Sequence, residues 1–425
     1  MTAPNLTADI NTVWTLSMAA LVFFMHAGFG FYEAGMCREK NTVDTLAHNL
    51  TILAITLGFY WLIGFGLMYG KGNGFSGAVG FAPTLVPSEA PQFPTLATKP
   101  VPLIAAFAFA LSFADTPATL IAGSGAERIR FSAVVLLAML ISTVIFPLVG
   151  HWNAGGGWFT SLTPPVYDTG SGMIQLCGGG CALAVALILG PRRGVKRHIW
   201  GEPDYEISSM PMVFLGTFVL WLGFLGFNAG YALRISGATG LVIINTLIAS
   251  GFGALSALTG AWVLTGKARL RTALVGVLTA SVAITSPSAI VAPWAAAVIG
   301  ALSGAMTVGS IRFWSRAGID DPTEYLTMNV FGGILGLLAV GLFASPAILQ
   351  AYPPDTPLGP GLFYGGGWGQ TASEAIAAGT IVAFAFALCA IACIGLRALN
   401  LLRVTPEEEC EGSDVATHGE HAEQR

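Results

Sequence analysis

Five side chains that can ionise lie within or at the edge of long apolar stretches of the chain: His26, Glu33, His48, Asp115 and Asp168. Such groups are costly in a nonpolar environment, so each is a candidate for a functional site. Asp168 opens an apolar run, where a carboxylate can cap a helix N-terminus and complement its dipole. It can also hold a loop carbonyl or act on a cation at a distance. We expect the capping role.

The other four have a structural and a functional interpretation. Glu33 is close to the basic end of its run, which favours an ion pair or an interfacial position. His26 and His48 are expected to tie helices together. Asp115 precedes Thr116 and Pro117, a helix-start pattern, so it either caps a broken helix or faces a pathway and binds a cation.

Enzymatic chemistry is not indicated. The chain has no nucleophile–base pair, no phosphate-binding glycine loop and no convincing metal-ligand spacing. Two cysteine pairs, Cys177/Cys181 and Cys389/Cys393, have one-turn spacing, which suits helix packing better than a metal. No basic stripe suggests nucleic acid. We therefore expect no enzyme activity, cofactor, metal or nucleic-acid partner.

The elements that must position these residues are long apolar helices. Hydrophobic residues make up 54% of the 425 residues and charged residues only 10%, whereas soluble domains average about 25% charged. Apolar runs near membrane-spanning length occur at about 11–36, 43–69, 101–124, 127–149, 169–190, 211–230, 240–264, 270–286, 287–309, 325–346 and 374–400. The sequence thus predicts an all-α polytopic membrane protein with eleven transmembrane helices. The boundary near Pro287 is the weakest.

Basic residues alternate between the gaps that separate these runs. Sixteen of the 19 Lys and Arg residues fall in alternate gaps, and only Lys71, Lys99 and Arg234 fall in the others. Basic loops stay on the cytoplasmic side. Because the first basic gap follows the first run, we expect the N-terminus outside and the C-terminus inside.

A weak internal repeat relates the fifth and tenth runs. Gln175–Gly179 resembles Met328–Gly333 in its paired glycines. Ten spans plus one extra fit an inverted five-plus-five repeat, in which a substrate path lies between the halves. We assign residues 1–403 to a transmembrane domain and 404–425 to an acidic cytoplasmic tail. The tail is either a disordered end or a docking strip.

Several motifs, in order along the chain, resemble the ammonium transporter family (Amt/Mep/Rh). They are Ala126–Ser132, Gly155–Trp158, Gly226–Gly230, Asp320–Pro322, Glu411–Asp414 and His418–Glu420. The resemblance extends from about Asn11 to Glu420. It implies a homotrimer in the plasma membrane (the inner membrane of bacteria) with one pore in each subunit. It also implies a PII-type regulator as the partner of the tail.

The resemblance assigns site residues position by position. Phe113 and Phe227 match two stacked phenylalanines that block the pore, and Phe109 matches an aromatic residue near the entrance. Asp168 matches a buried carboxylate behind an outer recruitment site for ammonium. Ring faces and a hydroxyl suit this cation physically.

Four positions depart from the family pattern. Ala154 stands where the recruitment-site tryptophan is expected, and Tyr231 replaces the recruitment-site serine. Leu176 and Asn329 occupy the places of the paired pore histidines. Leucine cannot exchange a proton or accept a hydrogen bond, and the asparagine amide does not titrate. The usual proton relay is therefore not expected here.

Three hypotheses remain open. In the first, the protein binds ammonium at the outer vestibule and passes ammonium or ammonia through a pore of unusual lining, with Asp115 as a possible additional cation site. In the second, it is a non-conducting ammonium sensor that signals to a separate cytoplasmic partner. In the third, it is a structural or regulatory subunit. We rank the third last because the two phenylalanines and Asp168 are kept.

Overall fold

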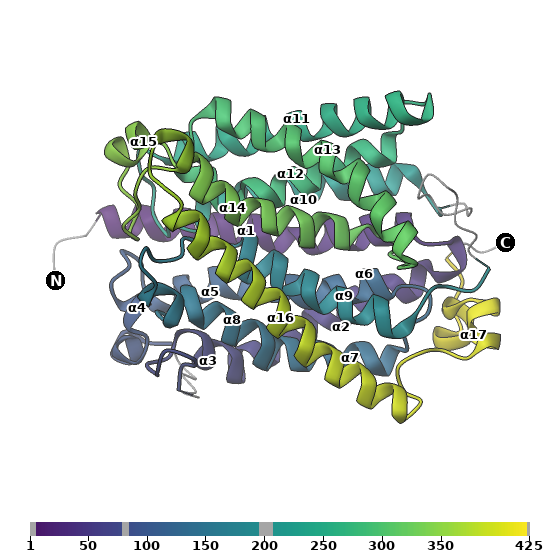
Figure 1. Cartoon of the computed structure of the whole chain (residues 1–425). Helices are drawn as coiled ribbons and strands as arrows, with labels where there is room; N and C mark the ends of the chain where they lie inside the picture. Colours follow the sequence, from purple (N-terminus) through teal and green to yellow (C-terminus); the bar gives the residue numbers. More distant parts are fainter. Residues whose placement is uncertain (1–5, 79–84, 195–206, 423–425) are drawn as a thin grey trace.

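The chain folds into a bundle of long helices that lie roughly side by side (Figure 1). The computed structural model describes residues 6–78, 85–194 and 207–422. Within these ranges there is no β-strand, and extended pairing is limited to the isolated bridges Gly72–Gly77 and Ile129–Arg403. The prediction of an all-helical fold is confirmed.

Six spans are uninterrupted helices: α1 (Leu6–Met36), α10 (Met210–Gly230), α11 (Thr239–Thr265), α12 (Leu270–Thr285), α13 (Pro293–Ala317) and α16 (Gly369–Ala398). Two others contain a π-helical turn in the middle: α2 (Thr42–Phe59) continues through Tyr60–Gly64 into α3 (Phe65–Tyr69), and α7 (Phe131–Leu140) through Ile141–Ile145 into α8 (Phe146–Asn153). In the described ranges, ten segments are long and apolar enough to cross a membrane, and the 16-residue α12 is shorter. The count of eleven crossings therefore stays a prediction.

Three spans that surround the site are interrupted. The third divides into α5 (Leu103–Phe113) and α6 (Thr116–Gly125). The fifth and tenth each begin with a π-helical turn: Ser171–Leu176 leads into α9 (Cys177–Leu189), and Leu326–Phe331 into α14 (Gly332–Phe343). Such turns are frequent at functional sites. The ninth span begins at Pro293, not at 287 as predicted, because a short 3-10 turn at Pro287–Ala289 separates it from α12.

Helix packing follows a pattern that recurs after five spans. In the first half α2 packs on α7 and α6 on α9; in the second half α11 packs on α13 and α12 on α14. The first helices of the two halves, α1 and α10, pack on each other. The extra helix α16 contacts both α9 and α14, and it crosses the front of the bundle obliquely (Figure 1). This arrangement agrees with the predicted five-plus-five repeat plus one helix.

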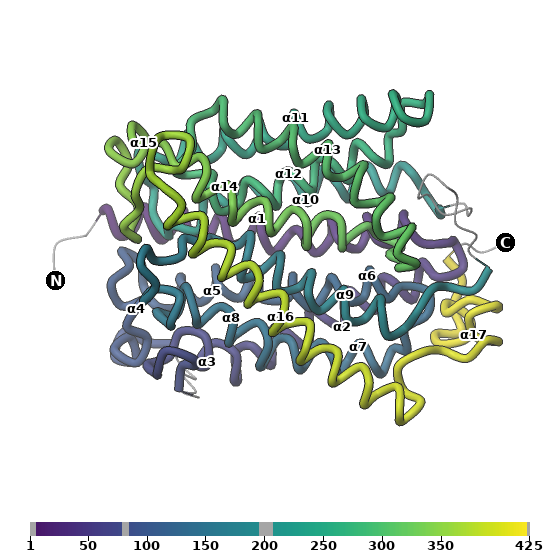
Figure 2. Tube along the Cα trace, viewed as in Figure 1, coloured from purple at the N-terminus to yellow at the C-terminus, as the bar shows by residue number. Residues whose placement is uncertain are grey.

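The start of α1 and the tail helix α17 (Pro406–Glu411) lie at opposite ends of the bundle (Figure 2). The tail is docked and helical. The Glu409 carboxylate is buried and accepts a hydrogen bond from Arg403 at 2.8 Å and one from the Arg193 backbone N–H at 2.6 Å. The His418 ring lies 3.0 Å from the Asp44 carboxylate at the start of α2. Of the two alternatives for the tail, the docking strip agrees with these contacts.

Charged residues of two motifs hold this end of the bundle together. Glu127 is buried and pairs with both Arg38 and Arg192. Arg192 also donates to the Asp320 carboxylate, at 2.9 and 3.0 Å. Although burial raises the pKa of Asp320, Arg192 and Arg128 outweigh burial and hold it well below its ordinary value. Asp320 therefore stays ionised and joins the α13 end to the loop after α9.

Candidate functional site

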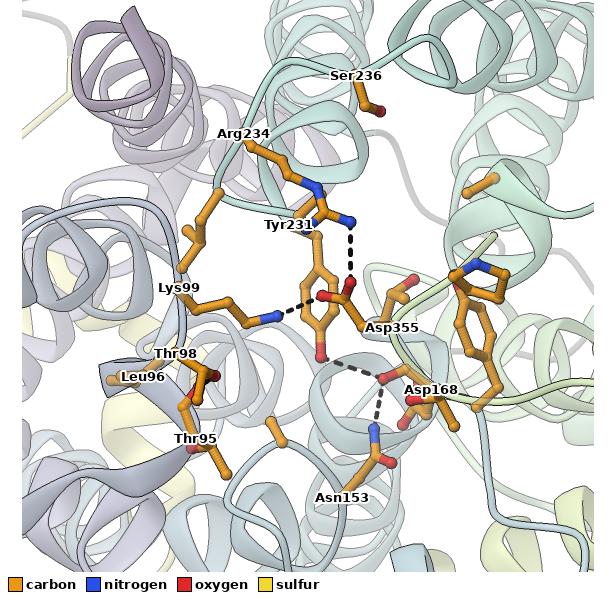
Figure 3. A pocket seen from close by; sticks show the side chains of 18 of the residues that line it. Thr95, Leu96, Thr98, Lys99, Asn153, Asp168, Tyr231, Arg234, Ser236 and Asp355 are labelled. Carbon is orange, nitrogen blue, oxygen red and sulfur yellow. Dashed lines mark hydrogen bonds and ion pairs between the residues drawn. The ribbon is translucent and has the colours of Figure 1, made fainter. Parts of the chain in front are cut away.

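A cavity of about 790 Å³ opens at the end of the bundle opposite the tail. Three segments supply most of its rim: the chain after the short helix α4 (Pro94–Ala97), the chain after α10, and the chain after α15 (Pro346–Ala351). Figure 3 shows this view, with Tyr231 and Asp168 toward its centre. Phe109, Phe113 and Ala154 also line the cavity. We call it the outer vestibule, after the orientation that the basic gaps predict.

Asp168 caps the fifth span, as predicted. Its Oδ1 accepts hydrogen bonds from the N–H groups of Gly170 (2.8 Å) and Gly172 (3.0 Å) and from the Ser286 hydroxyl (2.8 Å). Its Oδ2 accepts one from the Met173 N–H at 2.5 Å. Four donors thus fix this carboxylate behind the vestibule, where its role is to hold backbone in place.

The backbone carbonyl of Asp168 is the polar group that this cap presents to the vestibule. It accepts hydrogen bonds from Asn153 Nδ2 at 2.5 Å and from the Tyr231 hydroxyl at 3.3 Å (Figure 3). Burial raises the pKa of Tyr231 well above its ordinary value, so the phenol remains a neutral donor. Tyr231 is also one of the residues that line the vestibule. Asn153 was missed, and only its position beside Ala154 hinted at it.

Aromatic rings lie at the inner end of the vestibule. We call the rings of Phe109, Phe113 and Tyr231, which line it, the vestibule floor. The Phe109 and Phe113 ring centroids are 5.5 Å apart, and those of Phe113 and Phe227 are also 5.5 Å apart, with the planes at 82°. Phe113 and Phe227 are only 1% and 2% exposed. The two phenylalanines thus meet edge to face, whereas the resemblance implied stacked rings, and their role in blocking a pore stays a prediction.

Leu176 and Asn329 lie in the π-helical turns that open the fifth and tenth spans, Leu176 as the last residue of its turn and Asn329 within its turn. Both are buried. A Cβ built on Gly333 would lie 2.8 Å from the Leu176 Cβ, and one built on Gly179 would lie 3.0 Å from the Asn329 backbone. Each residue thus packs on a glycine of the other half. The Asn329 amide donates to the Tyr325 carbonyl at 3.0 Å, one turn earlier.

The histidines lie elsewhere. His26 pairs with Asp115 at 2.7 Å, and His48 stacks on Phe131. His151 bonds the backbone carbonyls of Met68 and Asn73. In sequence, none of the six histidines falls in the fifth or tenth span. His198 lies outside the described residues.

The side-chain partners of two buried carboxylates, Asp115 and Glu33, differ from those predicted. Asp115 lies at the break between α5 and α6, but its side chain does not cap α6; it pairs with His26 of α1. The expectation of an ion pair or interfacial position for Glu33 is wrong. Glu33 is fully buried and accepts hydrogen bonds from Asn49 (2.8 Å) and Tyr325 (2.8 Å). Both partners are neutral, and sequence spacing did not reveal them.

A bridge of charged residues at the vestibule rim was also missed. Asp355 accepts from Lys99 Nζ at 2.7 Å and from Arg234 at 2.8 Å (Figure 3). Although burial raises the pKa of Asp355, these two cations lower it below its ordinary value. One sequence feature could have indicated this bridge: Lys99 and Arg234 are two of the three basic residues that lie outside the basic gaps.

The fold and the site define a multi-pass integral membrane protein in which the outer vestibule ends at buried aromatic rings. The family model described as Ammonium Transporter Family matches residues 13–423. The chain belongs to this family.

Individual members of the family are similar to the chain over most of its length. The chain is 35% identical to "Ammonium transporter Amt2" of Archaeoglobus fulgidus over 98% of its length and 88% of the relative, and 30% identical to "Ammonium transporter" of Bacillus subtilis over 97% and 98%. A solved structure named "Sensor Amt Protein" is 31% identical, with a TM-score of 0.86 over 97% of this chain and 99% of that one. Candida albicans Mep2, at 24% identity and a TM-score of 0.85, shares the fold over 97% and 90%.

Proposed function

We propose that this protein binds ammonium in the outer vestibule and passes ammonium or ammonia through a central path in each subunit of a homotrimer. In this arrangement the vestibule faces outward and the tail faces the cytoplasm of a bacterial-type inner membrane. The observation that carries the proposal is a vestibule of about 790 Å³ that ends on Phe113, with Asp168 fixed behind it. Family membership and the names of the relatives support the choice of ligand.

Ammonium suits the groups that face the vestibule. The rings of Phe109, Phe113 and Tyr231 offer π-faces, which attract a cation by about 0.5–1 kcal/mol each at exposed sites. The Tyr231 oxygen can accept a hydrogen bond from an N–H of ammonium while its own O–H remains bonded to Asp168. Tyr231 thus takes over the roles of both the absent tryptophan and the absent serine.

Below the phenylalanines, the path favours a neutral species. Leu176 offers only methyl groups, so a bare cation there would lose its hydration without compensation. The Asn329 amide can bond ammonia but cannot take up a proton. In this proposal ammonium is bound outside and the uncharged form crosses the apolar segment. Asp115 is not required, because its carboxylate already pairs with the His26 ring of α1 at 2.7 Å.

The test is flux through the purified protein in proteoliposomes. A pulse of ammonium chloride should produce internal alkalinisation or transient current that exceeds that of empty vesicles. The Phe113→Trp variant should reduce the signal, because a larger ring fills the constriction. The signal should survive in Asp115→Asn. Absence of flux above empty vesicles, with the protein correctly folded and trimeric, excludes transport.

A second candidate function is ammonium sensing without conduction. Two observations favour it: Tyr231 crosses the vestibule floor to Asp168, and neither Leu176 nor Asn329 can relay a proton. The relative named "Sensor Amt Protein" supports it as well. The docked tail would then report occupancy to a separate signalling protein or PII-type regulator. Ammonium binding by calorimetry, together with zero flux and an ammonium-dependent change in hydrogen exchange of residues 405–418, would establish this alternative.

A further inference from the structure

The charged bridge over the outer vestibule has a composition unusual for the entrance to a cation site. Lys99, Asp355 and Arg234 come from three segments far apart in sequence and converge on one carboxylate. Each Asp355 oxygen receives one cation, Oδ2 from Lys99 at 2.7 Å and Oδ1 from Arg234 at 2.8 Å. All three residues line the vestibule.

Basic residues are rare on the side of the protein that is predicted to face outward, and two of them lie in this bridge. The chain has 19 Lys and Arg residues, and only three fall in the gaps assigned to the outer side. Two of those three lie in this bridge. The third, Lys71, is exposed and does not line the vestibule. Stability does not explain the convergence well, because half-exposed ion pairs contribute little to folding; the side chains here are 26%, 48% and 37% exposed.

The bridge carries a net charge of +1, since two cations face one carboxylate. The bridge and the Tyr231 ring line the same vestibule (Figure 3). A cation that enters must pass this positive charge. Because the side chains are partly solvated, water and salt weaken the repulsion without removing it.

We propose that Lys99, Asp355 and Arg234 form a charge filter that sets the affinity of the vestibule for ammonium, with Lys99 opposing and Asp355 favouring cation entry. This inference rests on the proposed function. It predicts an affinity lower than the aromatic floor alone would give. A site with this filter responds to high rather than trace ammonium concentrations. Neutral ligands do not experience the filter.

The test varies the charge in single steps. Ammonium binding to the purified full-length protein in nanodiscs is measured by titration calorimetry at low ionic strength. Lys99→Gln reduces the bridge charge to zero and should lower Kd about threefold, the effect of one unit charge about 7 Å away in water. Asp355→Asn raises the charge to +2 and should raise Kd by a similar factor.

A double variant separates charge from structure. Lys99→Gln with Asp355→Asn has no bridge but restores the charge of +1, so its Kd should return toward the wild-type value. If the bridge acts by holding the loop, the double variant will instead deviate further than either single variant, and the charge proposal fails. Lys71→Gln is the matched control, since it removes an outer charge away from the vestibule, and its Kd should not change.

Ionic strength provides the second readout. Near 1 M salt the screening length falls to about 3 Å, so the differences between variants should disappear. If wild-type protein binds ammonium but all variants share its Kd at low salt, the charge filter is wrong and the proposed function stands. If wild-type protein shows no ammonium binding, both are overturned.

Discussion

The hydroxyl of Tyr231 donates a hydrogen bond to the backbone carbonyl of Asp168 across the vestibule floor, at 3.3 Å. This contact joins the end of α10, in the second half of the repeat, to the start of the fifth span, in the first half. The same peptide region is fixed from behind by the Asp168 carboxylate, which accepts from Ser286 at 2.8 Å. The Tyr231 hydroxyl therefore bonds to a peptide that other hydrogen bonds hold in place, and a different rotamer of Tyr231 would lose this bond.

Tyr231→Ala should weaken ammonium binding and increase flux. Removal of one ring face costs about 0.5–1 kcal/mol, which corresponds to a two- to fivefold rise in Kd. The floor becomes open at the same time, so the rate of passage at saturating ammonium should rise. Calorimetry and proteoliposome flux measure the two effects separately.

Tyr231→Phe is the matched control for the ring. It retains the aromatic face and loses the hydroxyl, with both its bond to Asp168 and its acceptor oxygen for ammonium, so Kd should change less than in Tyr231→Ala, which loses the ring as well. Tighter binding by Tyr231→Ala, or equal effects of both variants, would contradict the role given to the ring.

Leu176→His combined with Asn329→His should introduce proton exchange into the path. The two positions occupy equivalent turns in the two halves, and each packs against a glycine of the other half. Imidazoles there would titrate near neutral pH and could exchange a proton. The double variant should show an ammonium-dependent current larger than wild type and dependent on pH between about 5 and 8.

Each single variant is the control for the pair. One imidazole has no partner with which to exchange a proton, so neither Leu176→His nor Asn329→His alone should reproduce the current. A double variant that folds as a trimer but matches the wild-type current at every pH would show that these positions do not line the path.

Apolar run length was sufficient to predict the helices, because a chain that spans lipid must satisfy its backbone groups within long apolar helices. The orientation predicted from the alternation of basic residues stays a prediction. The cap at Asp168 was predictable for a similar reason: a carboxylate at the start of an apolar run has backbone N–H groups as its nearest donors. These features depend on local sequence. The structure agrees with the helical character of the runs and with the cap, although the ninth span begins at Pro293 and not at 287.

Contacts between distant segments were not predictable in this way. Asp355 is 256 residues from Lys99 and 121 from Arg234, and each lies in an irregular loop without a period that would align them. The neutral partners of Glu33 come from two other spans. The π-helical turns at the starts of the fifth and tenth spans also have no propensity signal, since they arise from packing between the halves.

Glu409→Ala should release the tail. The Glu409 side chain is 1% exposed and contacts Arg403 and Arg193, which tie α17 to the bundle. Arg403 and Arg193 are 29% and 56% exposed, so both ion pairs are partly solvated, but the variant also loses the hydrogen bond that Glu409 accepts from the Arg193 backbone N–H. Hydrogen exchange of residues 405–418 should accelerate at least tenfold. Glu407→Ala, at an exposed position of the same helix, should leave the exchange unchanged.

Glu324→Gln should remove a pH dependence of stability at neutral to alkaline pH. Burial raises the pKa of Glu324 from 4.5 to about 8, although Arg271, at 3.1 Å, acts in the opposite direction. The folded protein thus holds a proton here that the unfolded chain releases near its ordinary pKa. The stabilisation is complete below about pH 4.5 and is lost as pH rises through about 8.

The wild-type thermal midpoint should therefore fall between pH 6 and pH 9, and Glu324→Gln should flatten this decline. Asp321→Asn is the matched control: burial raises the pKa of Asp321 only to about 6, so its contribution is lost at lower pH. Differential scanning fluorimetry across this range distinguishes the two windows. A wild-type midpoint that rises with pH, or a Glu324→Gln variant that retains the full decline above pH 7, would show that Glu324 is already ionised in the folded protein.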